Sequence, residues 1–412
     1  MIGGRLWRHP EFLKLWAGQS VSVVGDQITM LALPLAAVLV LDASAAEMGV
    51  LAAAGWLPHL LFALGAGLWV DRRRRKRWVM IATDLGRAAV LFSVPLAYWL
   101  DALTIEHLIA AAFAVGALTV LFDIAWGVLF MRVVPREDVV EANGKLMTSR
   151  SLSFVAGPPG AGGLVQAFGA PVAIVLDAVS FLVSALFVSR VRVDEGPVPE
   201  LNGESVRTRL ASGFRFLFRH EILRPTLLCF ATINLFNLGL WAIVILYFAE
   251  GLGLSAATIG ILLGTAAIGG VIGALVAPAV GRRIGIGPAV TVGAVLFTAP
   301  LLLFPLAGGP RPLLLGMLFA GEFLSGLGVM LLDIQGNSLT LLLTPEAMRA
   351  RQLATFKFIN YGVRPIGALG GGLLAEAIGL REALLVTAVG GMLGVLWLIP
   401  SPTPRLREVP SG

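Results

Sequence analysis

Long apolar runs separated by short polar segments dominate the chain. A helix that crosses a membrane needs about 20 mostly apolar residues. Twelve such runs follow one another, many with internal glycine and proline, which packed membrane helices tolerate. The runs lie at residues 12–41, 46–70, 77–100, 106–132, 137–168, 170–190, 222–250, 255–281, 285–307, 311–343, 346–378 and 380–400. This pattern predicts an all-α integral membrane protein with twelve transmembrane helices.

The composition indicates the same class and argues against several others. Of the 412 residues, 57% are hydrophobic and 14% are charged, whereas soluble domains have about 45–50% apolar and about 25% charged residues. One cysteine and four histidines argue against a disulfide framework and a metal site. The sequence contains neither a Gly-Lys-Ser/Thr phosphate loop nor a Ser-His-Asp pattern. We therefore expect no enzyme, no cofactor and no direct use of ATP.

The basic residues gather on one side of the predicted helices. The N-terminus, the loops after even-numbered helices and the C-terminal tail hold 24 of the 31 Lys and Arg residues. The opposite loops hold two, Arg311 and Arg381, and five lie inside the runs. The positive-inside rule then places both termini in the cytoplasm. Because topology accounts for the basic residues, the net charge of +6 does not indicate nucleic-acid binding.

The longest segment between runs, 191–221, begins as a linker and continues as an amphipathic helix. Its apolar residues recur at helical spacing, and its arginines occupy other faces. The apolar set is Val206, Leu210, Phe214, Leu217 and Phe218, and the basic set is Arg207, Arg209, Arg215 and Arg219. We interpret this as a helix on the cytoplasmic membrane surface, with a docking site for a partner as the alternative.

The second half of the chain repeats the first with a shift of 210 residues. Asp123 aligns with Asp333, and the glycine pattern of residues 160–169 recurs at 370–379 without a gap. Two parallel halves of six helices describe a transporter architecture in which substrate binds between the halves, near the bilayer midplane. We therefore expect an N-terminal bundle at 1–190, a cytoplasmic linker at 191–221, a C-terminal bundle at 222–400 and a cytoplasmic tail at 401–412.

Two segments resemble motifs of the major facilitator superfamily. Residues 67–77 (Gly-Leu-Trp-Val-Asp-Arg-Arg-Arg-Arg-Lys-Arg) resemble the signature of its loop between helices two and three, with departures at Trp69 and Arg74. Residues 157–163 (Gly-Pro-Pro-Gly-Ala-Gly-Gly) resemble the antiporter motif of its exporters, except that Ala161-Gly162 replaces the usual final glycine pair. The resemblance covers essentially the whole chain and implies the fold of that family.

Three further segments are similar to a narrower subset of the same family. They are residues 15–26, 84–87 and 141–143. That subset exports siderophores such as enterobactin, macrolides and other drugs. The resemblance therefore implies a small-molecule exporter of the bacterial cell membrane that works as a monomer.

The resemblance also implies a gating latch at the cytoplasmic side. Asp71, Arg75 and Asp123 would hold one state of the transporter, and protonation of a carboxylate would release it. Asp333, as the repeat of Asp123, would make the symmetric contact, and Gly67 and Arg72 complete the loop signature. The alternative is that the basic loop only anchors the topology.

Proline and glycine in the fifth predicted helix indicate a kink and close packing. Pro158 and Pro159 interrupt the helical hydrogen bonds, while Gly157 and Gly162 allow another backbone to approach. A link between these residues and antiport is implied by the resemblance alone.

Eleven ionisable residues lie inside the predicted spans, where each costs roughly 2.5–3.5 kcal/mol to insert. They are Asp26, Asp84, Arg87, Asp123, Lys145, Arg150, Asp177, Glu322, Asp333, Lys357 and Arg364. Asp26 lies midway along the first helix with no base within a turn or two. A carboxyl in such a dry site can carry a proton near neutral pH. We therefore predict Asp26 and Glu322 as the proton-coupling candidates, with pairing to Arg150 or Arg364 as the alternative.

The remaining buried charges divide between structure and substrate contact. Asp84 and Arg87 are spaced to pair on one helix face, and we interpret Asp177 as structural. Arg150 and Arg364 either bind an anionic substrate or neutralise the carboxylates.

These observations predict a secondary transporter that exports small amphipathic molecules by proton antiport with alternating access. Its partners are the substrate, the proton and the lipid bilayer. An uptake symporter or facilitator of the same fold is one alternative, and a membrane scaffold or sensor that transports nothing is another. The charges within the spans argue against a scaffold, which has no need to bear their cost.

Overall fold

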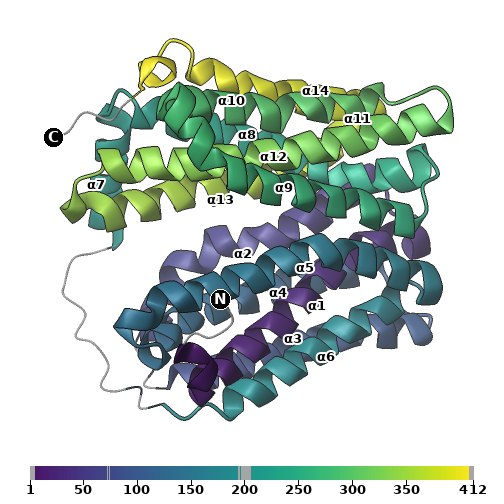
Figure 1. The fold of residues 1–412 in the computed structure, drawn as a ribbon. Coiled ribbons are helices and arrows are strands. Elements are labelled where there is room, and N and C mark those ends of the chain that lie inside the picture. The colour runs from purple at the N-terminus through teal and green to yellow at the C-terminus, as the bar shows by residue number, and fades with distance from the viewer. Residues whose placement is uncertain (1–4, 72, 74, 194, 196–205, 408–412) are drawn as a thin grey trace. The chain divides into compact units, whose positions relative to one another are not determined.

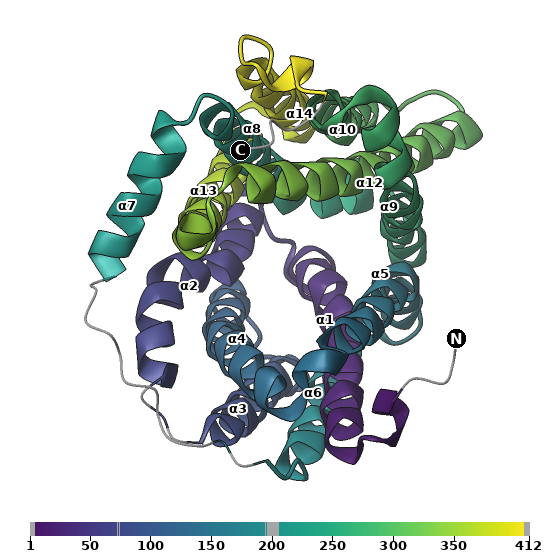
Figure 2. The same ribbon diagram turned by 60° about the vertical axis from the view of Figure 1, so that its left-hand side comes forward.

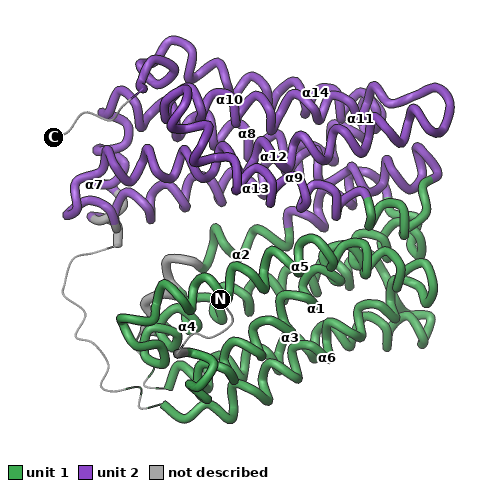
Figure 3. The backbone as a smooth tube through the Cα atoms, viewed as in Figure 1, with its two compact units in different colours: residues 1–43, 54–202, 254–261 green, residues 44–53, 203–253, 262–412 purple. Residues whose placement is uncertain are grey.

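The computed structural model describes residues 5–71, 73, 75–193, 195 and 206–407. Within these ranges, the side chains of residues 5, 63–65, 67, 68, 71, 206, 207, 209, 210 and 350 are outside the description. The chain divides into two compact units, which Figure 3 shows in two colours. Unit 1 comprises residues 1–43, 54–202 and 254–261, and unit 2 comprises residues 44–53, 203–253 and 262–412.

The helices of the first half of the chain form most of unit 1 (Figure 1). They are α1 (Pro10–Leu41), α2 (Ala45–Asp71), α3 (Lys76–Trp99), α4 (Ile105–Val133), α5 (Val139–Phe168) and α6 (Ala170–Ser189). Short 3-10 turns, η1 (Arg5–Arg8) and η2 (Arg136–Asp138), precede α1 and α5. The first residues of α2, up to Ala53, belong to unit 2 instead.

The helices of the second half form most of unit 2. They are α7 (Val206–Arg219), α8 (Leu223–Leu246), α9 (Ala256–Ile284), α10 (Ile286–Thr298), α11 (Leu303–Leu306), α12 (Arg311–Leu343), α13 (Arg349–Ile378) and α14 (Leu380–Leu393). Shorter turns extend or join them: η3 (Tyr247–Gly251), η4 (Ala299–Leu302), η5 (Glu346–Met348), η6 (Gly394–Trp397) and η7 (Thr403–Arg405). The start of α9, up to Ile261, belongs to unit 1.

Each of the twelve apolar runs lies on a helical segment, so the predicted all-α fold is confirmed for the described residues. Within those residues, ten helices are long and apolar enough to cross a membrane. The runs at 137–168 and 346–378 form α5 and α13, which are not among the ten. Both helices carry charged side chains in their first half, and these lower the mean hydropathy.

The two halves of the chain use the same helix pairs. In unit 1, α1 packs against α5 and α6, and α3 packs against α4 and α6 (Figure 2). In unit 2, α8 packs against α13 and α14, and α10 packs against α12 and α14. These are the same pairs once the repeat is applied. The repeat extends to the helix starts, where Nδ1 of His9 accepts from the amide of Phe12 at 3.2 Å and Nδ1 of His220 accepts from the amide of Leu223 at 3.3 Å.

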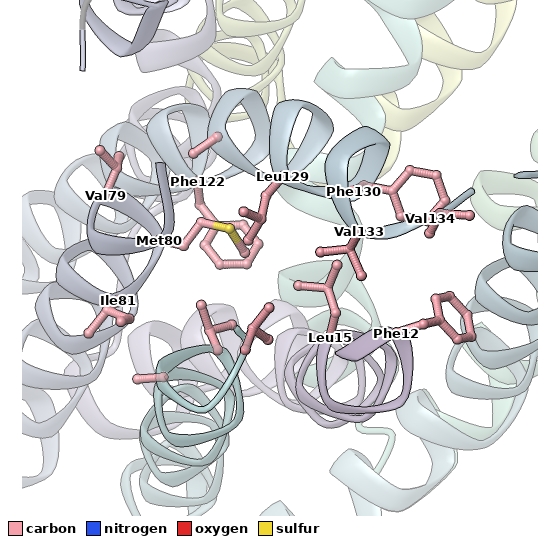
Figure 4. Packing of buried hydrophobic residues seen from close by; sticks show 14 of the residues in the cluster. Phe12, Leu15, Val79, Met80, Ile81, Phe122, Leu129, Phe130, Val133 and Val134 are labelled. Carbon is pink, nitrogen blue, oxygen red and sulfur yellow. The ribbon is translucent and has the colours of Figure 1, made fainter. Parts of the chain in front are cut away.

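A hydrophobic cluster joins α1, α3 and α4 of unit 1 at one end of the helices. Figure 4 shows Phe12 and Leu15 of α1, Met80 of α3, and Phe122 and Leu129 of α4 in this cluster. All five side chains are buried. A smaller cluster in unit 2 combines Phe230 and Ile233 of α8 with residues of α10 and α12. These clusters hold the helices that carry the polar residues described below.

The amphipathic segment of the linker forms α7, and α7 packs onto α13 within unit 2 (Figure 2). A Cβ on Gly213 would overlap the hydroxyl of Thr355, so this glycine allows the close contact. Leu217 is buried and packs with Leu223 and Leu227 of α8. The second half of α7 therefore contacts protein through Gly213 and Leu217, while Phe218 of the predicted apolar set is exposed. The position of α7 on the membrane surface stays a prediction.

Candidate transport site

An arginine buried between two aromatic rings lies at the centre of unit 1. Arg87 of α3 is 2% exposed and forms an ion pair with Asp84, which is fully buried one turn away on the same helix. Its guanidinium carbon lies 4.4 Å from the ring centroid of Phe122 and 4.0 Å from that of Phe181. The contacts fix the cation between α3, α4 and α6 and stabilise it there. The predicted pairing of Asp84 with Arg87 is present.

Asp26 of α1 lies close to this arginine in space. The charged groups that act on the Asp26 carboxyl are, from the strongest, Asp177, Arg87, Asp123 and Asp84. No base lies near Asp26 along α1 itself, so the nearby cation, Arg87, comes from a different helix, α3. The alternative partner Arg150 is exposed on α5.

Asp177 of α6 packs against the backbone of α1 beside Asp26. Its side chain is 1% exposed, and Ser180 Oγ donates to its Oδ1 at 3.0 Å. A Cβ on Gly25 would overlap both the Asp177 carboxyl and the Ser180 hydroxyl, so glycine is required at this position. Sequence reasoning set Asp177 aside as structural. The sequence pattern did not reveal the contact between Asp177 and the α1 backbone at Gly25.

The residues of the predicted latch are only partly described. Arg75 and Asp123 are exposed. Gly67 and the Asp71 side chain lie outside the described side chains, and Arg72 lies outside the described residues. The latch therefore stays a prediction.

The linker contributes an acceptor to the same end of unit 1. The carboxylate of Glu195 accepts from the backbone amides of Lys76 and Arg77, at the first turn of α3. A carboxylate at a helix N-terminus interacts favourably with the helix dipole and satisfies free amides. Glu195 thereby ties the segment after α6 to the basic loop, a contact that the sequence pattern did not reveal.

In unit 2, an arginine is held by amide side chains. Nε of Arg364 on α13 donates to Oδ1 of Asn234 on α8 at 3.0 Å. Nδ2 of Asn234 donates to Oδ1 of Asn360 at 3.2 Å, and the Arg364 guanidinium lies 4.6 Å from the ring centroid of Tyr361. Asp333 of α12 is within electrostatic range of Arg364. The structure thus places Arg364 in a polar network with Asn234 and Asn360, and Asp333 acts on Arg364 electrostatically.

Glu322 of α12 has a very different setting. Its side chain is 1% exposed, and its Oε1 makes no hydrogen bond within the described part of the chain. No described charged group acts on the Glu322 carboxyl, and burial is the one influence on it. Glu322 therefore has no described contact with Arg364 or its asparagine partners.

The glycines of the antiporter-like motif make close backbone contacts in unit 1. A Cβ on Gly157 would come within 2.5 Å of the Gln27 Cβ, and a Cβ on Gly162 would come within 3.0 Å of the Gly260 Cα at the start of α9. The repeat-related contact occurs in unit 2, where a Cβ on Gly372 would come within 2.6 Å of the Gly49 Cα. Pro158 lies in α5, and its carbonyl oxygen also faces Gly260.

Comparison with known proteins decides the family. The sequence profile of the Major Facilitator Superfamily matches residues 15–362 and 227–412. The chain belongs to the major facilitator superfamily. It is 28% identical to the multidrug efflux pump Tap of Mycolicibacterium fortuitum, over 98% of this chain and 97% of the relative. It is also 26% identical to macrolide efflux protein A of Streptococcus pyogenes, over 44% of this chain and 45% of the relative.

A solved structure supports the same fold. A bacterial homologue of the iron transporter ferroportin, in its inward-facing state, superposes with a TM-score of 0.78 at 18% identity. The match covers 96% of this chain and 99% of that structure. As a member of the major facilitator superfamily, the protein is a multi-pass membrane transporter of the bacterial cell membrane and not an enzyme.

Proposed function

We propose that this major facilitator protein exports small amphipathic molecules, of the drug or siderophore kind, by proton antiport with alternating access. The export of such molecules is supported by its similarity to a multidrug efflux pump and a macrolide efflux protein. The observation that carries the coupling is the buried Asp177 carboxyl, which packs against the backbone of α1 at Gly25, next to Asp26 in the chain. A membrane-buried carboxyl is costly and is retained where ions or protons move.

The mechanism needs two states that differ in proton and substrate affinity. A proton on the Asp26 carboxyl removes a negative charge from the centre of unit 1, and its release restores that charge. Either ligand shifts the balance of states only by its differential affinity for them. The proposed arrangement has twelve spans, cytoplasmic termini and a monomeric transport unit.

The test measures proton release in inverted membrane vesicles. Vesicles acidified inside, with a pH-sensitive dye, are given ethidium or erythromycin as the probe substrate. We expect each substrate to release protons from wild-type vesicles, and Asp26→Asn to abolish this release while substrate exchange without a proton gradient continues. Asp101→Asn, which changes an exposed carboxylate between α3 and α4, is the matched control.

A second variant separates the two proton-coupling candidates. Glu322→Gln removes the buried Glu322 carboxyl of unit 2. We expect coupling to survive, because no described charged group interacts with this carboxyl. Loss of coupling in Glu322→Gln, with coupling intact in Asp26→Asn, would move the proton site to unit 2. If the wild-type protein transports a probe without proton movement, proton antiport is contradicted, and the alternative of a facilitator of the same fold is favoured.

A further inference from the structure

The proposed mechanism gives no step of its own to Asp177 of unit 1. Because Gly25 has no side chain, the α6 carboxyl of Asp177 lies against the backbone of α1 one residue before Asp26. At this position it acts electrostatically on Asp26. A membrane protein gains no stability by burying a second carboxylate beside the first unless a proton or a cation accompanies them.

Among the described charged groups that act on Asp26, three are acids and one is a cation. From α3 come Asp84 and Arg87, from α4 comes Asp123, and from α6 comes Asp177. The fifth helix contacts α1 through Ser149, which is hydrogen-bonded to Ser20 at 3.0 Å, and through Gly157, which lies against Gln27. Arg87 is therefore the one described cation that acts on both Asp26 and Asp177.

The single guanidinium is already engaged by one of these acids. Nη2 of Arg87 donates to Asp84, and its two aromatic contacts hold it at that position. Its Nε is buried and donates to no described residue. Arg87 therefore has one unused donor inside the region where Asp26 and Asp177 lie, and both acids are within its electrostatic range.

We propose that Asp26 and Asp177 form one proton-binding pair, which holds a single proton between two carboxyl groups. This inference rests on the proposed proton antiport and adds Asp177 as the second coupling residue. Two neighbouring carboxylates in a medium of low dielectric constant cannot both be ionised without a large cost, so the pair binds and releases one proton as a unit.

The step is a proton transfer without other bond changes. In the state that is open to the acidic side of the membrane, a hydronium ion transfers a proton to one carboxylate oxygen of the pair and becomes water. In the state that faces the cytoplasm, that O–H bond breaks, the proton leaves to water, and the pair carries two negative charges. The buried guanidinium of Arg87 then balances part of this charge.

The experiment compares Asp177→Asn, Asp26→Asn and the double variant in full-length protein reconstituted in proteoliposomes. The readouts are proton-driven accumulation of ethidium and its exchange without a proton gradient, each measured as a function of pH. We expect each single variant to lose accumulation and keep exchange, and the double variant to lose no more than either single one. Asp101→Asn should behave as wild type.

A conservative variant keeps the test informative if Asp177→Asn does not fold. Asp177→Glu retains the carboxyl and moves it by one methylene, so coupling should persist with the pH midpoint of accumulation displaced by about one unit or more, as expected for strongly interacting sites. A merely structural Asp177 would alter the yield of monodisperse protein without moving this midpoint.

The outcomes distinguish the two proposals. If wild-type protein moves ethidium without protons, the proposed antiport fails, and this inference fails with it. If wild-type transport is proton-coupled but Asp177→Asn or Asp177→Glu keeps the wild-type coupling and pH midpoint, Asp26 acts alone and only the pair is wrong.

Discussion

The two units share one pattern of helix packing but fill their interiors with different chemistry. In unit 1, Arg87 is paired with Asp84 and contacts two aromatic rings, and Asp26 and Asp177 lie within its electrostatic range. In unit 2, Arg364 is held by asparagine and tyrosine, and the buried Glu322 stands apart. The two units thus share their helix pairs, whereas their buried charged residues and the partners of those residues differ. This difference is the reason why we propose proton handling for unit 1 and not for unit 2.

The glycine contacts provide the most severe test of what the repeat preserved. Gly162→Leu in unit 1 and Gly372→Leu in unit 2 each force a side chain into a neighbouring backbone. Overpacking of this kind costs roughly 1–3 kcal/mol, and we expect each variant to lose most of its transport. The measurement is the initial rate of ethidium accumulation in vesicles, normalised to the amount of folded protein.

Matched controls exist beside both glycines. A Cβ on Gly163 or on Gly370 would meet nothing within 4 Å, so Gly163→Leu and Gly370→Leu should transport nearly as well as wild type. If Gly162→Leu inactivates the protein and Gly372→Leu does not, the two contacts are not functional equivalents, and the shared packing has diverged as well.

The two buried arginines should respond unequally to the same conservative change. Arg87→Lys removes the planar guanidinium group and weakens its contacts with two aromatic rings. It should destabilise the protein by roughly 1–3 kcal/mol. Arg364→Lys should cost less, because Arg364 is half-buried whereas Arg87 is almost fully buried. Thermal unfolding in detergent compares the two, and equal losses would mean that the aromatic enclosure of Arg87 adds nothing.

The histidine at the start of α8 should give the smallest effect. Nδ1 of His220 accepts two backbone hydrogen bonds, so the cap requires the neutral ring, and partial burial lowers the pKa of His220. Its stabilising contribution is therefore present above the unfolded-state pKa, near 6.5, and is lost as the pH falls through the lower folded-state pKa. The His220→Ala variant should lose about 1 kcal/mol or less at neutral pH.

The pH dependence supplies the control for this small effect. The difference in melting temperature between wild type and His220→Ala should shrink when both are measured under more acidic conditions. A difference that stays constant across that range would show that the hydrogen bonds of the imidazole are not what stabilises this helix start.

Local pattern was enough to predict the helices and part of the site. The spacing of Asp84 and Arg87 by one turn is a property of a single helix, and the structure contains that ion pair. The glycines of the antiporter-like motif were expected to allow close approach, and Gly157 and Gly162 do. The role of Asp177 was not predicted, because its relation to Asp26 depends on the rotation of α6 against α1.

The sequence by itself determined the class of protein, the helical segments and the repeat. Each follows from the order of residues along the chain. The length of an apolar run predicts a membrane-spanning helix, and a duplication leaves matching residues at a fixed offset. Only the tertiary structure decided which buried charges meet. A helix places a side chain on one face, but the facing residue comes from another part of the chain, as Phe181 does for Arg87 and Asn234 does for Arg364. Such contacts are set by how helices pack, and one sequence read along its length does not contain their register.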